Sequence, residues 1–246
     1  MTFSDEEIER YARHLMLAEV GGPGQQRLKA ARVALVGLGG IGAPAGLYLA
    51  AAGAGTLRLI DDDTIALSNL QRQILFQSAD VGHAKVEVGA ERLTALNPHV
   101  QIEAVPERLT DSNAATLLAD CDVVIDGTDD FETRFVVNAV CVGTGVPLVS
   151  GALGRWSGQV GVFAGQPCYR CLVADTPPDA ETCARVGVVG ALAGVIGAMA
   201  AMEAIKLITG AGQPLTGRLL IYDGLAAATR VVAVTPDPGC LTCGGA

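Results

Sequence analysis

The feature that most constrains the fold is a glycine-rich stretch between a short apolar run and a longer run of small residues. Arg32–Val36 (RVALV) predicts a buried strand, and it is followed by GLGGIG (37–42) and a predicted helix that reaches Ala52. In such a unit the glycines let the backbone approach a phosphate, and the helix N-terminus offers aligned N–H groups. We therefore predict a dinucleotide-type binding turn in preference to a glycine-rich turn that binds nothing.

Apolar runs alternate with helical stretches along the first 150 residues. Further strands are predicted at 56–60, 100–105, 123–126 and 147–150, and helices at 85–96, 114–118 and 131–142. Strands that alternate with helices form a parallel sheet with right-handed crossovers. The sequence thus predicts a Rossmann-like, mostly parallel α/β sheet with helices on both faces.

The pattern differs at the two ends of the chain. Beyond Ser150, strands are predicted at 159–163 and 219–222, separated by a loop at 174–185 and a Gly/Ala-rich helix at 191–207. We expect these strands to extend the same sheet with antiparallel pairing. At the N-terminus, the capping-box spacing of Ser4 and Glu7 predicts a helix from about Asp5 to Leu17, and GGPG (21–24) predicts a turn.

The 246 residues are expected to form one domain with an N-terminal helical segment (1–30), a nucleotide-binding part (31–150) and a C-terminal part (151–246). Its 17 Lys and Arg against 26 Asp and Glu give a net charge of -9, which argues against nucleic acid and anionic membranes as partners. The acidic N-terminus lacks a secretory signal, so the cytoplasm is expected. The apolar stretch 186–202 is predicted to be a buried small-residue helix, because it falls short of a membrane span.

Polar residues after the second predicted strand indicate a nucleotide. Asp61 lies 19 residues beyond Gly42, where a carboxylate can accept hydrogen bonds from ribose hydroxyls; alone, this would suggest NAD. However, LSNLQRQ (67–73) brings amides and Arg72 next to that position, and Lys85 follows on the next helix. Two cations suit the polyphosphate tail of a nucleotide. We therefore predict that Arg72 and Lys85 bind ATP, in preference to the alternative that both are solvated surface residues.

A second acidic group follows the predicted strand 123–126. In DGTDD (126–130), Asp129 or Asp130 could hold Mg²⁺, which binds one or two carboxylates together with phosphate oxygens and water. One of the two aspartates could instead cap the helix that begins at Phe131.

The chain has seven cysteines, and four of them form two Cys-x-x-Cys pairs separated by 68 residues. Four thiolates suit tetrahedral Zn²⁺ and leave no open position for catalysis, so a structural zinc site is predicted. Its ligands would be Cys168, Cys171, Cys240 and Cys243. Cys121 and Cys141 are predicted packing residues. Cys183, two residues before Arg185 in the predicted loop, is either a reactive thiol or an inert loop cysteine.

The combination of motifs resembles the ThiF/MoeB/HesA family, bacterial relatives of ubiquitin-activating enzymes, over nearly the whole chain. The motifs that carry the resemblance are RYARH (10–14), GLGGIG (37–42), LSNLQRQ (67–73), Thr128-Asp129, CYRC (168–171) and the terminal Cys-x-x-Cys. The resemblance implies adenylation of the C-terminal Gly-Gly carboxylate of a small ubiquitin-like sulfur carrier, with consumption of MgATP and release of pyrophosphate.

The resemblance also implies roles for individual residues. Gly39, Gly40 and Gly42 would lie at the nucleotide, Asp61 would hold the ribose, Asn69, Arg72, Gln73 and Lys85 would bind the phosphates, and Asp129 would lie beside the metal. Arg13 would reach the ATP of a partner subunit, so a homodimer is expected. Cys183 matches a loop cysteine that in some relatives bonds to the carrier. Relatives commonly have Asn at the position of Asp130, so the local charge in this chain is more negative than the family pattern implies.

The identity of the carrier is less well defined. Thr182 and Cys183 favour a MoaD-like carrier in molybdenum cofactor biosynthesis, whereas GVVG (187–190) and YDG (222–224) resemble enzymes that act on the ThiS-like carrier of thiamin biosynthesis. We expect the MoaD-like carrier. No rhodanese-like extension follows the last cysteine pair, so a separate sulfur donor protein is expected. The alternatives of another class are an NAD-dependent oxidoreductase and a non-catalytic carrier-binding scaffold.

Overall fold

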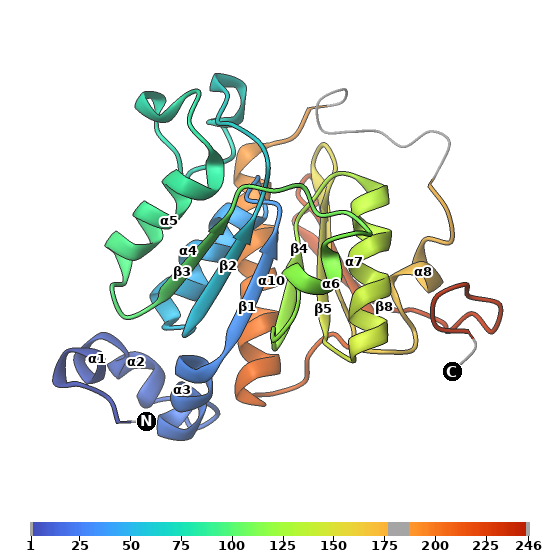
Figure 1. Ribbon diagram of the computed structural model, residues 1–246. Coiled ribbons are helices and arrows are strands. Elements are labelled where there is room, and N and C mark those ends of the chain that lie inside the picture. The colour runs from blue at the N-terminus through green and yellow to red at the C-terminus, as the bar shows by residue number, and fades with distance from the viewer. Residues whose placement is uncertain (1, 177–186, 245–246) are drawn as a thin grey trace.

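The computed structural model describes residues 2–176 and 187–244, which build one eight-stranded sheet (Figure 1). The strands are arranged in the order β3-β2-β1-β4-β5-β6-β7-β8. The first five in this order pair in parallel, and β5 to β8 pair antiparallel, which confirms the expected mixed sheet. Their bounds are β1 (Arg32–Val36), β2 (Thr56–Ile60), β3 (Gln101–Val105), β4 (Val123–Asp126), β5 (Leu148–Leu153), β6 (Ser157–Phe163), β7 (Arg218–Asp223) and β8 (Ala228–Ala233).

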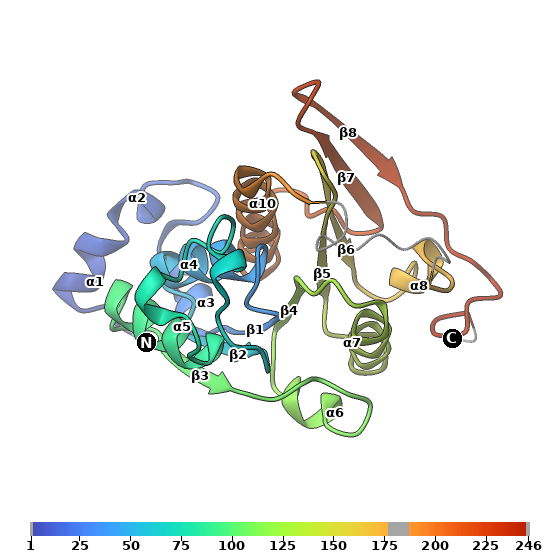
Figure 2. The ribbon, with the colours of Figure 1, turned by 90° about the horizontal axis from the view of Figure 1, so that it is seen from above.

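Helices cover both faces of the parallel part of the sheet (Figure 2). Because successive strand residues point to opposite faces, Val33 and Leu35 pack on one side, and Ala34 and Val36 on the other. The first side is covered by α4 (Gly42–Ala52), α5 (Lys85–Leu96) and α10 (Gly190–Thr209). The second is covered by α6 (Ala114–Leu117), α7 (Phe131–Thr144) and α8 (Tyr169–Leu172).

The N-terminal segment differs from its prediction at two points. The expected single helix is interrupted at Tyr11, so that α1 (Asp5–Arg10) and α2 (Ala12–Leu15) are separate. The Tyr11 side chain is buried, and its hydroxyl accepts a hydrogen bond from Asn97 at 2.9 Å. The predicted turn at 21–24 is instead the start of α3 (Gly21–Ala30), since a proline is tolerated in the first turn of a helix.

Helix α10 is long and apolar enough to cross a membrane by length and composition alone. In this fold Leu192, Ile196 and Ala200 are buried in the core, and an added side chain at Gly197 would lie 2.4 Å from Pro44 of α4. Its buried Glu203 accepts a hydrogen bond from the backbone N–H of Leu215 at 2.8 Å. The helix is therefore part of the protein core, as predicted.

Candidate functional site

A cavity of about 490 Å³ lies at the carboxyl ends of the parallel strands, where open α/β sheets bind ligands. Its wall includes residues of β1, β2, β5 and β6 and of the segments that follow β1, β2 and β4. The carboxyl ends of the parallel strands lie toward the top of Figure 1. The sequence-predicted residues that line it are Gly39, Gly40, Asp61, Asn69, Arg72, Gln73, Lys85 and Asp129. The fold thus brings together the proposed ribose, phosphate and metal residues.

The glycine-rich turn has two different requirements for glycine. Gly39 and Gly40 face the cavity, so the backbone there is accessible to a ligand. Gly42 lies outside the lining, but an added Cβ would be 1.9 Å from the carbonyl oxygen of Gly37, which itself has φ of 82°. Gly42 therefore permits the close return of the turn onto α4, and any contact with the nucleotide belongs to Gly39 and Gly40.

Asp61 and Lys85 form the polar floor of the cavity. The carboxylate of Asp61 accepts hydrogen bonds from the N–H of Leu38 at 2.6 Å and of Asp63 at 2.9 Å. The ammonium of Lys85 donates to Asp63 at 2.6 Å and lies 3.6 Å from Asp61. Burial raises the pKa of the Asp61 carboxyl above its ordinary value, although Lys85 and the two N–H groups act in the opposite direction. Burial therefore destabilises the ionised form of Asp61, and hydroxyl groups that donate hydrogen bonds to the carboxylate would stabilise it.

The 3-10 helix η1 (Leu67–Asn69) and the turn after it carry the remaining predicted phosphate ligands. Asn69 accepts a hydrogen bond from the N–H of Ala66 at 3.1 Å, which orients its amide, and Arg72 donates to the carbonyl of Ser68 at 3.0 Å. Gln73 is buried, and its Oε1 has no hydrogen-bond partner among residues 2–176 and 187–244. A buried amide oxygen without a partner favours a ligand or water at this wall.

The two aspartates after β4 have different environments. Asp130 is the N-cap of α7: its Oδ2 accepts from the N–H of Thr133 at 3.0 Å and its hydroxyl at 2.6 Å, and it pairs with Arg108 at 3.3 Å. Burial raises the pKa of Asp130, but these contacts outweigh it and hold the pKa below its ordinary value. Asp129 is exposed and makes no side-chain hydrogen bond or ion pair within the part of the chain that the structure describes. Of these two aspartates, Asp129 is therefore the one whose carboxylate remains available to a ligand, beside the neighbouring group of Asp61, Asp62 and Asp63.

Two charged residues at this site were not predicted from the sequence. Asp126 ends β4 and is fully buried, and Arg134 on α7 is buried beneath the cavity wall. Arg134 donates hydrogen bonds to the carbonyls of Thr128 and Gly151. Asp126 begins the DGTDD motif but received no role, and Arg134 belongs to none of the motifs, because an arginine within a helix and an aspartate at a strand end are usually solvated.

The predicted site residue of the N-terminal segment is not brought into the cavity. Arg13 lies on α2, near the opposite end of the sheet, and does not line the cavity (Figure 1). Cys183 lies outside the described residues.

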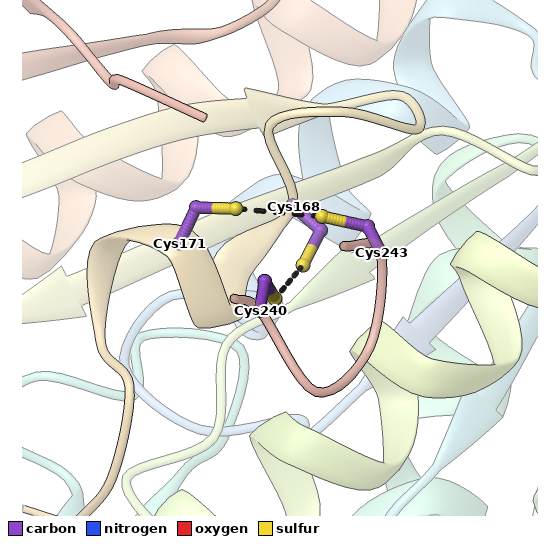
Figure 3. A group of neighbouring side chains, drawn as sticks. All are labelled: Cys168, Cys171, Cys240 and Cys243. Atoms are coloured by element: carbon purple, nitrogen blue, oxygen red, sulfur yellow. Dashed lines mark hydrogen bonds between the residues drawn. The ribbon is translucent and has the colours of Figure 1, made fainter. Parts of the chain in front are cut away.

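The four predicted zinc ligands converge in one cluster (Figure 3). Cys168 and Cys171 flank and enter α8, whereas Cys240 and Cys243 come from the C-terminal tail. The Sγ atoms of Cys168 and Cys240 lie 3.6 Å apart, those of Cys171 and Cys243 lie 3.4 Å apart, and all four lie within 4.8 Å of one another. None of these cysteines forms a disulfide.

This cluster fits a tetrahedral zinc ion. Zn–S bonds of about 2.3 Å place neighbouring sulfurs about 3.8 Å apart, close to the spacings observed. The surroundings supply donors to sulfur, as expected around bound thiolates: Asn138 Nδ2 lies 3.5 Å from Cys168 Sγ, and the N–H of Asp237 lies 3.5 Å from Cys171 Sγ. Asn138 also accepts from the N–H of Tyr169 at 2.8 Å, which ties α8 to α7.

Fold and site together define an α/β protein with a polar cavity at the carboxyl ends of its parallel strands and a four-cysteine cluster that could hold zinc. The chain belongs to the ThiF family, whose defining pattern matches residues 11–242. It is 46% identical to the sulfur carrier protein adenylyltransferase of Thermus thermophilus, across 99% of this chain and 93% of that protein. It is also 46% identical to the molybdopterin-synthase adenylyltransferase of Escherichia coli, across 98% of each chain.

Further relatives extend the comparison. The sulfur carrier protein ThiS adenylyltransferase of Escherichia coli is 43% identical across 98% of this chain and 97% of its own length. A crystal structure of Escherichia coli MccB with ATP is 26% identical, with a TM-score of 0.79 over 96% of this chain and 74% of that one. The chain is accordingly a nucleotidyltransferase of the adenylyltransferase type.

Proposed function

We propose that this enzyme adenylates the C-terminal Gly-Gly carboxylate of a small ubiquitin-like sulfur carrier, consuming MgATP and releasing pyrophosphate. The observation that carries the proposal is the single cavity that joins a buried carboxylate, Asp61, to two cations, Arg72 and Lys85, and to the unpaired carboxylate of Asp129. A dehydrogenase needs a carboxylate for the ribose, such as Asp61, but it does not need the two cations or the second carboxylate. The names of the relatives support the same reaction.

The reaction needs orientation and charge stabilisation rather than an enzyme nucleophile. An oxygen of the carrier carboxylate attacks the α-phosphorus of ATP, and the bond from that phosphorus to the bridging oxygen breaks as pyrophosphate leaves. Arg72 and Lys85 spread the developing negative charge, while Asn69 and Gln73 supply neutral hydrogen bonds. Asp61 accepts hydrogen bonds from the ribose and so fixes the position of the α-phosphate. Asp129 would hold Mg²⁺, which would supply further charge neutralisation at the phosphates.

A second hollow, of about 740 Å³, supports a protein substrate. It lies at the same edge of the sheet, between the turn after β5 and the turn after β7, and includes the half-exposed Trp156 and the exposed Leu225. We assign the C-terminal part, 151–246, to carrier binding on this basis, since an extended Gly-Gly tail could pass from this hollow to the nucleotide cavity.

The preferred carrier is the MoaD-like small subunit of molybdopterin synthase, and the ThiS-like carrier is the alternative. Relatives named for both substrates are about equally similar to this chain. The preference for the MoaD-like carrier comes from Thr182 and Cys183, which lie outside the described residues.

ATP–pyrophosphate exchange with each purified carrier tests the proposal. Exchange that depends on the MoaD-like carrier is expected, and exchange with the ThiS-like carrier alone would reverse the assignment. Tight NAD(H) binding without carrier-dependent exchange would instead support an oxidoreductase. Carrier binding without exchange at saturating Mg²⁺ and ATP would support a scaffold.

We further propose that the active enzyme is a homodimer in which Arg13 reaches the ATP of the partner subunit. The supporting observation is that Arg13 lies apart from the cavity of its own chain. Mixing Arg13→Ala subunits with Arg72→Ala subunits should restore exchange in mixed dimers, because one of the two sites then contains both arginines. No recovery in mixed dimers would contradict this role.

A further inference from the structure

Buried charges hold the peptide groups on both sides of Thr128. Asp126 Oδ1 accepts hydrogen bonds from the N–H of Thr128 at 3.0 Å and from its hydroxyl at 2.7 Å. On the other side, Arg134 Nη2 donates to the Thr128 carbonyl. We call Asp126 and Arg134 the Thr128 clamp.

Both members of the clamp are withdrawn from water. Asp126 is 0% exposed and Arg134 is 5% exposed, and the ring of Tyr169 lies 5.8 Å from the guanidinium carbon. Arg134 also donates to the Gly151 carbonyl at 2.7 Å and the Ser150 hydroxyl at 3.3 Å, which anchors it to β5. Burying two charges costs free energy, and Asp126 Oδ2 has no hydrogen-bond partner in the described chain. Buried polar groups that are held together by hydrogen bonds rigidify the backbone to which they bind, here the backbone at Thr128.

The clamped peptide leads directly into Asp129. Since the Asp129 side chain makes no hydrogen bond or ion pair with residues 2–176 and 187–244, its position depends on the backbone on either side of it. The clamp fixes that backbone before Asp129, and the capping contact of Asp130 with Thr133 fixes it afterwards.

We propose that Asp126 and Arg134 are positioning residues that hold the Asp129 carboxylate where it binds Mg²⁺ with ATP. This inference rests on the proposed function, because it assumes that Asp129 is the metal-binding carboxylate. Arg134 lines the inner wall, attracts the Asp129 carboxylate through its charge and holds the backbone before it through the Thr128 carbonyl. Its loss should therefore alter the response to Mg²⁺ more than the affinity for ATP alone.

The test is the dissociation constant of ATP measured by titration over a range of free Mg²⁺ concentrations. Arg134→Met should raise the Mg²⁺ concentration for half-maximal effect by about tenfold or more, because partners that orient metal ligands contribute roughly 10- to 100-fold to metal affinity. Affinity for ATP without Mg²⁺ should change by less than about twofold. Arg27→Met is the matched control: Arg27 also donates to a backbone carbonyl, that of Thr209, but at α3, away from the cavity.

A double-variant cycle separates positioning from general damage. In an Asp129→Ala background, Arg134→Met should add little to the loss of Mg²⁺ response, since the carboxylate that it positions is already absent. Independent, multiplying effects would overturn the proposal. An Arg134→Met protein with the wild-type Mg²⁺ response would overturn it as well.

Milder variants keep the test informative if Arg134→Met does not fold. Arg134→Lys retains the charge but cannot serve three acceptors with a planar fork, and Thr128→Val removes one bond to Asp126. Each should raise the half-maximal Mg²⁺ concentration with little change in melting temperature, and unchanged responses in both would contradict the clamp. A wild-type enzyme that binds no ATP would remove the proposed function, and this inference with it.

Discussion

The carboxylate of Asp61 and the ammonium of Lys85 lie 3.6 Å apart on the cavity floor, and each side chain is less than 10% exposed. Lys85 is drawn further toward Asp63, at 2.6 Å, so Asp61 is only partly compensated. Burial accordingly leaves the pKa of Asp61 above its ordinary value. The free enzyme thus maintains a carboxylate that is more costly to ionise in the folded state than in the unfolded state.

Asp61→Asn should stabilise the nucleotide-free protein while weakening ATP binding. A carboxyl with a raised folded-state pKa lowers stability fully above that pKa, and the penalty disappears as the pH falls below the ordinary value. The variant should therefore melt at a higher temperature than wild type near pH 7, and the difference should shrink toward pH 4. Melting curves at several pH values measure this, and a lower melting temperature at pH 7 would contradict it.

Arg72→Ala should reduce carrier-dependent exchange by about a hundredfold or more, because it removes charge stabilisation of the reacting phosphates. Its melting temperature should change by less than about 2 °C, since among the described residues the side chain makes one hydrogen bond, to Ser68. Lys85→Ala should lose exchange to a similar degree but also destabilise the protein, because Asp61 stays buried without its cation. Near-normal turnover in both variants would refute the phosphate roles.

Asp129→Ala should fail mainly through metal binding, so excess Mg²⁺ should partly restore exchange. Asp130→Asn is the paired comparison. Asparagine caps a helix as well as aspartate does, so this variant should keep its Mg²⁺ dependence and lose near pH 7 only the small stabilisation that comes from the charge of Asp130, whose pKa is held below its ordinary value. If Asp129→Ala changed neither the rate nor the Mg²⁺ dependence, Asp129 would be only a turn residue.

Removal of zinc should destabilise the C-terminal tail before it affects the nucleotide cavity. Chelation, or Cys168→Ser, should lower the melting temperature by roughly 5 to 10 °C, equivalent to about 2 to 3 kcal/mol for a domain of this size. Cys121→Ala should retain one equivalent of zinc, because this thiol lies outside the cluster. Freshly purified protein without zinc, or melting unaffected by chelation, would argue against a structural metal.

Cys183→Ala should leave pyrophosphate exchange nearly intact and impair at most sulfur transfer from the separate donor protein. Adenylation uses the carrier carboxylate as nucleophile, so no enzyme thiol is required in that step. The activated carbonyl of the acyl-adenylate is, however, open to attack by a thiolate. A folded, zinc-loaded variant without exchange would place the cysteine in the first chemical step.

Prediction from the sequence succeeded where local pattern and burial agree. The bounds of β1, β2 and β4 match their predictions, because buried parallel strands are short apolar runs with polar or glycine residues at their ends. β8 was not predicted, since Ala228–Ala233 is exposed along its whole length as an edge strand and lacks an apolar face. α3 was not predicted because GGPG (21–24) forms a helix only with its tertiary neighbours, among them Thr209 at the end of α10.

The same limit applies to the site. The residues in short motifs, such as Asp61 and Arg72, could be proposed from spacing alone, and the fold brings them to one cavity. Arg134 could not, since its sequence context does not distinguish a buried arginine that holds Thr128 and Gly151 from a solvated one. A residue that positions another one through backbone hydrogen bonds does not need a characteristic sequence motif, so its role cannot be predicted from the sequence alone.

The change from parallel to antiparallel pairing at β5 bears on how such a chain can diversify. The residues of the cavity that are proposed to contact ATP come from the segments after β1, β2 and β4 and from the start of α5, whereas the turns after β5 and β7 border the second hollow. Substitutions in those two turns can accumulate without disturbing the phosphate ligands. With the carrier bound at the second hollow, as proposed, catalysis and substrate choice can evolve separately within one continuous sheet, and the same phosphate chemistry becomes available to a new protein substrate.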